Sequence, residues 1–145
     1  MYFGSYKHTL DDKGRLLIPK KIKEELKNSA SLYIMKGFEG CLAIYNQSEF
    51  EKLVKECESL SFNKTNNRSY LRVMLASVSE LQIDKVGRIQ LPSQVLSKFQ
   101  IGKEVVILGV IDHFEIWDAD KFDKYQQEAN DNFESIAESL DRSDD

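Results

Sequence analysis

Short apolar stretches organise this chain, some alternating with polar residues and others stepping by three and four. Alternation and compact apolar runs between turn residues predict strands, whereas steps of three and four predict amphipathic helices. Strands are predicted at residues 2–10, 16–18, 32–35, 41–45, 80–83 and 89–91, with a further hairpin at residues 104–117. Helices are predicted at residues 20–28, from residue 48, after residue 67, at residues 93–99 and from residue 118. The mixture indicates an α+β fold.

The three longer predicted helices each carry an apolar stripe that needs a partner surface. Ser48, followed three residues later by Glu51, predicts a capping box at the start of the first. In chain order the stripes are Phe50, Leu53, Val54, Cys57 and Leu60; Leu71, Met74, Leu75 and Val78; and Phe122, Tyr125, Ala129, Phe133, Ile136 and Leu140. The last stripe is covered either by the protein's own sheet or by a neighbouring subunit, and its length favours the subunit.

One nine-residue motif occurs twice. Residues 11–19 and 84–92 both read Asp-x-x-Gly-Arg-x-x, followed by Ile or Leu and then Pro, at an offset of 73 residues. The match continues beyond the motif, and the offset becomes 72 where Ile44-Tyr45 corresponds to Ile116-Trp117. A connecting loop that differs by one residue explains the change. An internal repeat decides how the rest of a chain is interpreted, so the fold prediction rests on two copies of one unit.

The Asp-x-x-Gly-Arg motif has a physical basis as a turn. An Asp side chain accepts hydrogen bonds from backbone N–H groups two residues further on, and Gly adopts a positive φ at little cost. We therefore expect a tight hairpin or bulged turn with Arg15, or Arg88, at its rim. Ion pairs from Asp11 and Asp84 that only stabilise the turns are the alternative. Two copies at matched positions favour a functional role.

The doubled motif resembles that of the MraZ family of bacterial transcriptional regulators, whose halves are each similar to the AbrB/SpoVT/MazE type of DNA-binding unit. The resemblance extends from residue 1 to about residue 140 and includes the opening Met-Tyr-Phe-Gly and residues 112–117. It implies tandem AbrB-like repeats that form an internal pseudo-dimer, a swapped-hairpin (double-split) β-barrel with flanking helices. Both turns would emerge on one face.

The same resemblance implies a sequence-specific regulator that binds double-stranded DNA in the cytoplasm, associated with the nucleoid. Proteins of this family form ring-shaped homo-oligomers and recognise short direct repeats upstream of the division and cell-wall gene cluster. The matching domain division is a first repeat at residues 5–47, connecting helices at 48–76, a second repeat at 77–120, and a C-terminal helix with an acidic tail at 121–145.

Each residue of the motif has an expected role at the DNA. Arg15 and Arg88 are assigned to base edges in the major groove, where a bidentate Arg–guanine contact discriminates by ~1–3 kcal/mol. Lys13 and Lys85 are assigned to phosphates, which position the protein without specifying sequence. The turn-shaping residues are Asp11, Gly14, Asp84 and Gly87. Further phosphate contacts are considered for the outward lysines of the helix after Pro19, with a solvated helix face as the alternative: Lys20, Lys21, Lys23 and Lys27. They are also considered for the basic ridge of Lys64, Arg68 and Arg72, with pairing to acids of a neighbouring subunit as the alternative.

Charge counts qualify this assignment. A net charge of −4 and a pI near 5.3 are unusual for a nucleic-acid binder. Residues 118–145 hold ten acidic and three basic residues, a net charge of −7 that leaves +3 on residues 1–117. A basic face with an acidic tail fits DNA binding better than the total does. Val86 stands where the first copy has Lys13, so the second turn is expected to be one charge poorer.

Enzyme chemistry is not predicted. His8 and His113 are far apart, no metalloprotease, P-loop or hydrolase motif is present, and Cys41 begins an apolar strand rather than a nucleophile site. No cofactor, metal or small-molecule substrate is expected. The absence of an 18-residue apolar run predicts no membrane span, and two cysteines without a disulfide framework indicate the cytosol.

Two other functions remain open. The chain is either a protein-interaction module of antitoxin type without sequence-specific DNA binding, or a ring scaffold without a ligand. Antitoxins of the related group usually carry one repeat and an extended partner-binding tail, whereas this C-terminal segment has helical apolar spacing. Gel retardation at two salt concentrations separates the three, because only the regulator retains sequence-dependent binding at the higher salt.

Overall fold

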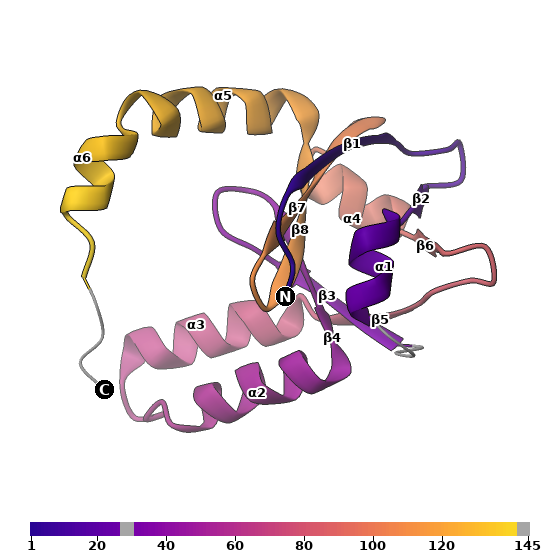
Figure 1. The fold of residues 1–145 in the computed structure, drawn as a ribbon. Coiled ribbons are helices and arrows are strands. Elements are labelled where there is room, and N and C mark those ends of the chain that lie inside the picture. Colours follow the sequence, from indigo (N-terminus) through magenta and orange to yellow (C-terminus); the bar gives the residue numbers. More distant parts are fainter. Residues whose placement is uncertain (27–30, 142–145) are drawn as a thin grey trace.

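The computed structural model describes residues 1–26 and 31–141 of the chain. Within them are eight strands: β1 (Ser5–Thr9), β2 (Arg15–Leu17), β3 (Ser31–Lys36), β4 (Leu42–Asn46), β5 (Ser79–Gln82), β6 (Arg88–Gln90), β7 (Glu104–Val110) and β8 (His113–Asp118). The same residues form six helices: α1 (Lys20–Leu26), α2 (Gln47–Glu58), α3 (Thr65–Ala76), α4 (Ser93–Lys98), α5 (Ala119–Asp131) and α6 (Phe133–Glu138). The fold is α+β, as predicted (Figure 1).

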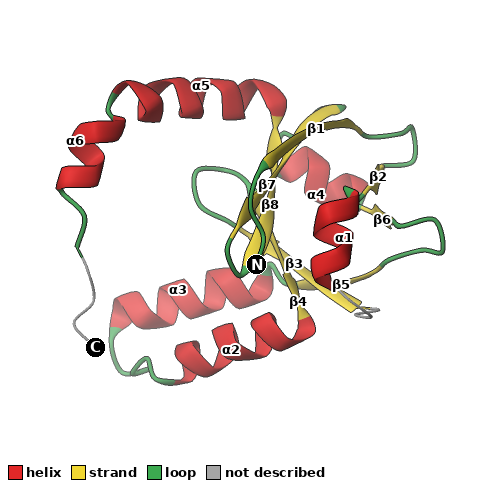
Figure 2. Ribbon diagram, viewed as in Figure 1, coloured by secondary structure: helices red, strands yellow, loops and turns green. Residues whose placement is uncertain are grey.

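The strands form two antiparallel sheets that join the repeats (Figure 2). One has six strands in the order β1-β7-β8-β4-β3-β5, and the other consists of β2 and β6. Only the hairpins β3–β4 and β7–β8 stay within a repeat. The pairings β1–β7 and β5–β3 are equivalent under the repeat, and β4 pairs with its own counterpart β8. The two repeats are therefore interleaved, as an internal pseudo-dimer requires.

Alternation along the strands covers the six-stranded sheet on both faces. Ile34, Ile44, Ile107 and Ile116 join the main core, which includes residues of β2, β6 and α1 from the other side. Their neighbours in sequence belong to two smaller clusters on the opposite face, one with α2 and α3 and one with the start of α5. The layer of β2, β6, α1 and α4 is thus fixed to the sheet through the core and presents its other side outward (Figure 1).

The closed barrel implied by the family resemblance is not present. Among the described residues no pairing joins the two sheets, and β1 and β5 remain the edges of the larger one. The motif explains this outcome. Its Gly-containing turns redirect the chain after β1 and β5, and Pro19 and Pro92, which have no N–H to donate, follow shortly after β2 and β6. Each three-residue strand therefore pairs only with its counterpart.

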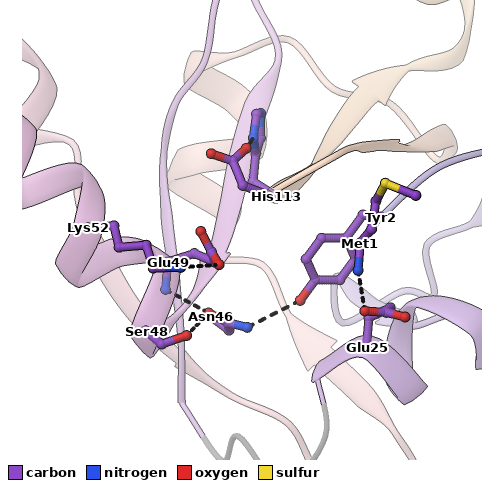
Figure 3. A network of polar contacts seen from close by, with 9 residues as sticks. Met1, Tyr2, Glu25, Asn46, Ser48, Glu49, Lys52 and His113 are labelled. Atoms are coloured by element: carbon purple, nitrogen blue, oxygen red, sulfur yellow. Dashed lines mark hydrogen bonds and ion pairs between the residues drawn. The ribbon is translucent and has the colours of Figure 1, made fainter. Parts of the chain in front are cut away.

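The start of α2 differs from the predicted capping box. The N-cap is Asn46, whose Oδ1 accepts hydrogen bonds from Glu49 N (2.9 Å) and Ser48 Oγ (3.2 Å). Its Nδ2 donates to Tyr2 OH at 3.4 Å (Figure 3). Ser48 lies inside the first turn of the helix, because Asn46 has the extended backbone (ψ 172°) that an N-cap requires.

The other predicted elements are present with shifted ends. The first strand begins at Ser5 because Gly4 has φ +88°, and Tyr2 forms only an isolated bridge with Ile111. The helix after Pro19 is described as far as Leu26, so its predicted last two residues and the loop after it lie outside the described residues. The predicted frayed end likewise lies outside them beyond residue 141.

Two of the predicted buried stripes are only partly buried. In α2 the stripe holds for Cys57, but Leu60 lies beyond the helix and is 36% exposed. In α3 Met74 is buried whereas Leu75 is 46% exposed. The two helices pack on each other and on one face of the sheet, so each has a narrower covered face than its apolar spacing suggests.

The predicted last helix is two helices. It breaks at Asn132, which caps both α5 and α6. Only the beginning of α5 is covered, where Trp117 contacts the rings of Phe122 (5.4 Å) and Tyr125 (5.1 Å). Further along, Phe133 is 67% exposed, and α6 has no buried residue. The protein's own sheet therefore leaves the later part of this stripe uncovered, where α5 and α6 extend away from the sheet (Figure 1).

Replacing Asn46 tests the N-cap. Asn46→Ala removes the acceptor for Glu49 N and is expected to lower the free energy of unfolding by about 1 kcal/mol, measured by urea denaturation. Ser48→Ala is the matched control and is expected to change it by less than about 0.5 kcal/mol. A larger loss in the free energy of unfolding for Ser48→Ala than for Asn46→Ala would support Ser48 as the N-cap and contradict the assignment to Asn46.

Candidate nucleic-acid interface

The first copy of the motif folds into a turn built around one carboxylate. Asp11 Oδ1 accepts hydrogen bonds from the backbone N–H groups of Lys13 (2.9 Å) and Arg15 (2.8 Å). Backbone bonds from Gly14 N to Asp11 O (3.0 Å) and from Asp11 N to Arg15 O (3.1 Å) close the turn. Asp11 Oδ2 pairs with Arg15 Nε at 2.6 Å. The same side chain thus shapes the backbone and orients the guanidinium.

The second copy repeats this geometry. Asp84 Oδ1 accepts from the N–H groups of Val86 (2.9 Å) and Arg88 (2.9 Å), and Oδ2 pairs with Arg88 Nε at 2.9 Å. Gly87 N donates to Asp84 O at 3.0 Å, and Asp84 N donates to Arg88 O at 2.9 Å. The two turns are therefore equivalent atom for atom, although two of the five residues differ.

The ion pairs leave each arginine with free donors. Both pairs predicted by the alternative interpretation are formed, but they use only Nε, whereas a guanidinium has four more N–H donors on its Nη atoms. No further ion pair of either arginine is found among the described residues. The side chains of Arg15 and Arg88 are 32% and 31% exposed. Each guanidinium is thus held at one edge and open at the other.

The register of β2 and β6 places both arginines on one face. The pairs are Arg15 with Gln90, Leu16 with Ile89, and Leu17 with Arg88. Directly opposite residues of an antiparallel pair point to the same side, and side chains alternate along each strand. Leu16 and Ile89, which are buried in the core, point inward, so Arg15 and Arg88 point outward together. Such diagonal neighbours lie roughly 7–8 Å apart.

Hydrogen bonds across the pseudo-dyad tie the two turns to each other. Leu91 N donates to Gly14 O at 2.9 Å, and Ile18 N donates to Gly87 O at 3.0 Å. Gly14 (φ +75°) and Gly87 (φ +93°) both adopt a conformation that favours glycine. The loops that hold them emerge on the same side of the molecule, on either side of β2 and β6 (Figure 1).

The two aspartates are held ionised. Hydrogen bonding from the backbone N–H of Arg15 is the main cause that lowers the pKa of Asp11, and Arg88 lowers the pKa of Asp84 in the same way. The opposing effect of partial desolvation is smaller, because both carboxylates are exposed to water. A folded-state pKa below the unfolded value gives stabilisation that is present above the unfolded pKa and is lost as pH falls through the folded one. Near neutral pH both arginines therefore stay clamped.

The second turn is not the poorer one in charge. Lys13 has no counterpart because Val86 occupies that position, but Lys85 stands where the first copy has Asp12. In addition, Asp12 pairs with Lys103 at 3.2 Å. The expected loss of one charge considered only Val86. When Lys85 is included as well, the second motif has one more positive charge than the first.

Two lysines outside the motif lie beside the turns, and only one of them, Lys103, has no expected role from the sequence. Lys103 directly precedes β7, and its side chain pairs with Asp12 in the first turn. Its backbone O accepts a hydrogen bond from Leu10 N, which holds it beside that turn. Lys23, on α1, reaches the second turn: a Cβ on Gly87 would lie 2.9 Å from Lys23 Nζ. Helical spacing placed Lys23 on the outward face among the possible phosphate contacts, but its contact with the second turn was not predicted. The residue 73 positions later, Leu96, lies against Gly14 in the same way.

The other predicted phosphate contacts are not all brought together. Lys20 and Lys21 lie on α1 in the same layer as the turns, with Lys21 Nζ 5.9 Å from the ring centroid of Phe3. Arg68 and Arg72 lie on α3, on the far side from the turns (Figure 1). There Arg68 Nη1 donates to two loop carbonyls at 3.1 Å, so its position is explained by local structure.

No arrangement typical of catalysis is found in the described part of the chain. Burial raises the pKa of the Cys41 thiol and keeps it protonated, and His113 is stacked on Tyr45 and paired with Asp112 Oδ1 at 2.7 Å. The described residues contain no group of three or more His, Cys, Asp or Glu side chains placed to hold a metal ion. Nor does any described helix have the length and apolarity needed to cross a bilayer.

Fold and site together define an internally duplicated α+β protein with a doubled arginine turn. The family model described as "MraZ protein, putative antitoxin-like" matches residues 1–73 and again residues 74–143. A Mesoplasma florum protein named Transcriptional regulator MraZ is 42% identical over 140 residues, which are 97% of this chain and 95% of the relative. Proteins of the same name from Lactobacillus helveticus and Mycoplasmoides gallisepticum are 36% and 37% identical over 141 residues, covering 97% of this chain and 97% and 98% of theirs. The chain belongs to the MraZ family.

The two turn glycines are expected to differ in their tolerance of alanine. Both substitutions place a Cβ at positive φ, which costs about 1 kcal/mol or more. A Cβ at residue 87 would lie close to the end of the flexible Lys23 side chain. A Cβ at residue 14 would lie 2.8 Å from the backbone oxygen of Leu91, which cannot move as easily. Gly14→Ala should therefore destabilise by ~1–3 kcal/mol more than Gly87→Ala in urea denaturation. Equal losses would show that the cross-turn contact at Gly14 is not tight.

Proposed function

We propose that this protein is a transcriptional regulator that binds DNA sequence-specifically through its two Asp-x-x-Gly-Arg turns. The observation that carries the proposal is the register of β2 and β6, which points Arg15 and Arg88 outward from one face. The name shared by its relatives, transcriptional regulator, supports the same function. The antiparallel pair is a narrow β-ribbon, and a major groove about 12 Å wide admits such a ribbon.

The clamped arginines suit base recognition. Each carboxylate holds Nε, so the outward Nη edge is oriented before DNA arrives and little side-chain entropy remains to be lost. An oriented guanidinium edge matches the O6 and N7 acceptors of guanine. Asp11 and Asp84 act as positioning residues, and their charge is offset by the arginine that each one holds.

Lysines around the turns supply the phosphate contacts. Lys13 and Lys85 are exposed at the tips of their loops, and Lys20 and Lys21 follow on α1. Few cations per chain mean weak binding per chain, so affinity has to come from several chains on several sites. A ring of chains on the direct repeats upstream of the division and cell-wall gene cluster, in the cytoplasm at the nucleoid, meets that requirement.

The C-terminal helices are the proposed contact between chains. Phe133, Ile136 and Leu140 are 67%, 45% and 60% exposed, although they continue the apolar stripe of α5. A regular apolar stripe that the fold leaves open is typical of an association surface. A neighbouring subunit of the same chain would bury it, and this accounts for a helical rather than an irregular C-terminal segment.

An antitoxin-type interaction module is the second candidate. The description of the matched family as antitoxin-like favours it. The doubled, outward-facing arginines favour DNA, because a protein partner does not require two equivalent guanidinium groups on a ribbon of groove width. The candidates differ in one observable, the preference for a specific duplex at raised salt.

Loss of both arginines is expected to abolish sequence preference. Arg15→Ala with Arg88→Ala removes two contacts worth ~1–3 kcal/mol each, so preference for a duplex from the region upstream of the protein's own gene, over a shuffled duplex, should fall at least about 30-fold in gel retardation. Circular dichroism and light scattering should show an unchanged fold and assembly. Arg72→Ala is the control and leaves the preference intact. Undiminished preference in the double variant would contradict the assignment.

Charges placed in the C-terminal stripe are expected to break the assembly. Phe133→Asp with Ile136→Asp introduces two desolvation penalties into the proposed contact and should yield particles of 16.8 kDa by light scattering, where the unsubstituted protein is larger. Ile111→Asp, at another exposed apolar residue, is the matched control and should not change the mass. A 16.8 kDa mass for the unsubstituted protein would rule out this contact.

A further inference from the structure

The two turns are covered by different side chains across the pseudo-dyad. Lys23 on α1 and Leu96 on α4 are 73 residues apart, and each lies against the turn glycine of the other repeat. A Cβ on Gly87 would meet Lys23 Nζ at 2.9 Å, Cε at 3.3 Å and Cδ at 3.4 Å. A Cβ on Gly14 would meet Leu96 Cδ1 at 3.4 Å. Equivalent positions thus deliver an ammonium group to one turn and a methyl group to the other.

The remaining charges act in the same direction. Residues 11–15 hold two acids and two bases, whereas residues 84–88 hold one acid and two bases. Beside the first turn Lys103 is engaged by Asp12, whereas Lys23 has no ion pair among the described residues. The second turn therefore carries the greater positive charge available to a ligand, and the structure breaks its own two-fold symmetry at the face that holds both arginines.

We infer that Lys23 contacts a DNA phosphate beside the second turn and makes that turn the stronger backbone anchor of the two. This inference rests on the proposed function. The end of the Lys23 side chain lies against Gly87, at the rim of the turn, and its ammonium forms no ion pair within the described residues. Lys23 takes the place of the lysine that the second motif lacks at Val86, and its ammonium binds a phosphate as a point charge.

A difference in phosphate binding between the two turns would also determine in which direction the protein lies along the DNA. A reader with true two-fold symmetry fits inverted half-sites and binds either way round. A pseudo-dimer in which one turn has Lys23 and the other has Leu96 can distinguish the two directions of a duplex. Direct repeats all run in the same direction along the DNA. Each chain of an assembly bound to them must therefore distinguish the two directions of the duplex.

The test is a salt titration of full-length variants on a duplex from the region upstream of the protein's own gene. Lys23→Met removes the charge and retains the stem, Lys23→Arg retains the charge, and Lys55→Met changes a lysine on α2, away from the turns. Lys23→Met should reduce the slope of log affinity against log salt by about one unit, equivalent to about a 3.5-fold difference between 50 and 200 mM salt. Lys23→Arg and Lys55→Met should match the unsubstituted protein.

Phosphate ethylation interference on the same duplex locates the contact. Lys23→Met should lose interference at one phosphate adjacent to a guanine whose recognition depends on Arg88, not Arg15. An unchanged slope in Lys23→Met, alongside a shift in Lys85→Met, would overturn the inference and leave the proposed function standing. Equal losses in Lys23→Met and Lys23→Arg would assign the effect to packing and overturn it too. Failure of the unsubstituted protein to prefer this duplex over a shuffled one would instead refute the proposed function.

Discussion

A single carboxylate in each turn controls both the path of the backbone and the direction of an arginine. Asp11 and Asp84 each accept two backbone N–H groups with one oxygen and the Nε of an arginine with the other. Because these bonds also keep the carboxylates ionised, the clamp persists at neutral pH. Without it, the Gly turn would have no fixed register and the guanidinium no fixed edge. The outward Nη donors are a consequence of this one interaction.

Duplication turns one clamped arginine into a pair of equivalent arginines on one face. Among the described strands, β2 and β6 pair only with each other, while Leu16 and Ile89 anchor them in the core with roughly 1.5–3 kcal/mol each. The glycine carbonyl of each turn also accepts a hydrogen bond from a backbone N–H of the other repeat. The two arginines are therefore part of one rigid ribbon, whose equivalence is broken locally where Lys23 and Leu96 occupy matching positions.

The α+β class and the equivalence of the two turns followed from the repeat, because a motif at constant offset preserves its local bonds. The interleaving of the repeats was implied by the family resemblance alone, because periodicity does not show which strands pair. Burial was predicted less well, since periodicity shows that a face is apolar but not what covers it: Leu75 and Phe133 fit their stripes and are exposed. The N-cap at Asn46 depended on a backbone angle that no spacing reveals. Helical spacing placed Lys23 on an outward face but could not show that it lies against Gly87, because that contact joins the two repeats.

Methylation interference on the upstream duplex tests the central claim most directly, because dimethyl sulfate modifies guanine N7 in the major groove and adenine N3 in the minor groove. Two clamped guanidinium groups on one ribbon predict interference at guanine N7. The guanines should fall into two sets, of which Arg15→Ala loses one and Arg88→Ala the other. Interference confined to adenine N3, or a single set that survives both substitutions, would contradict the account.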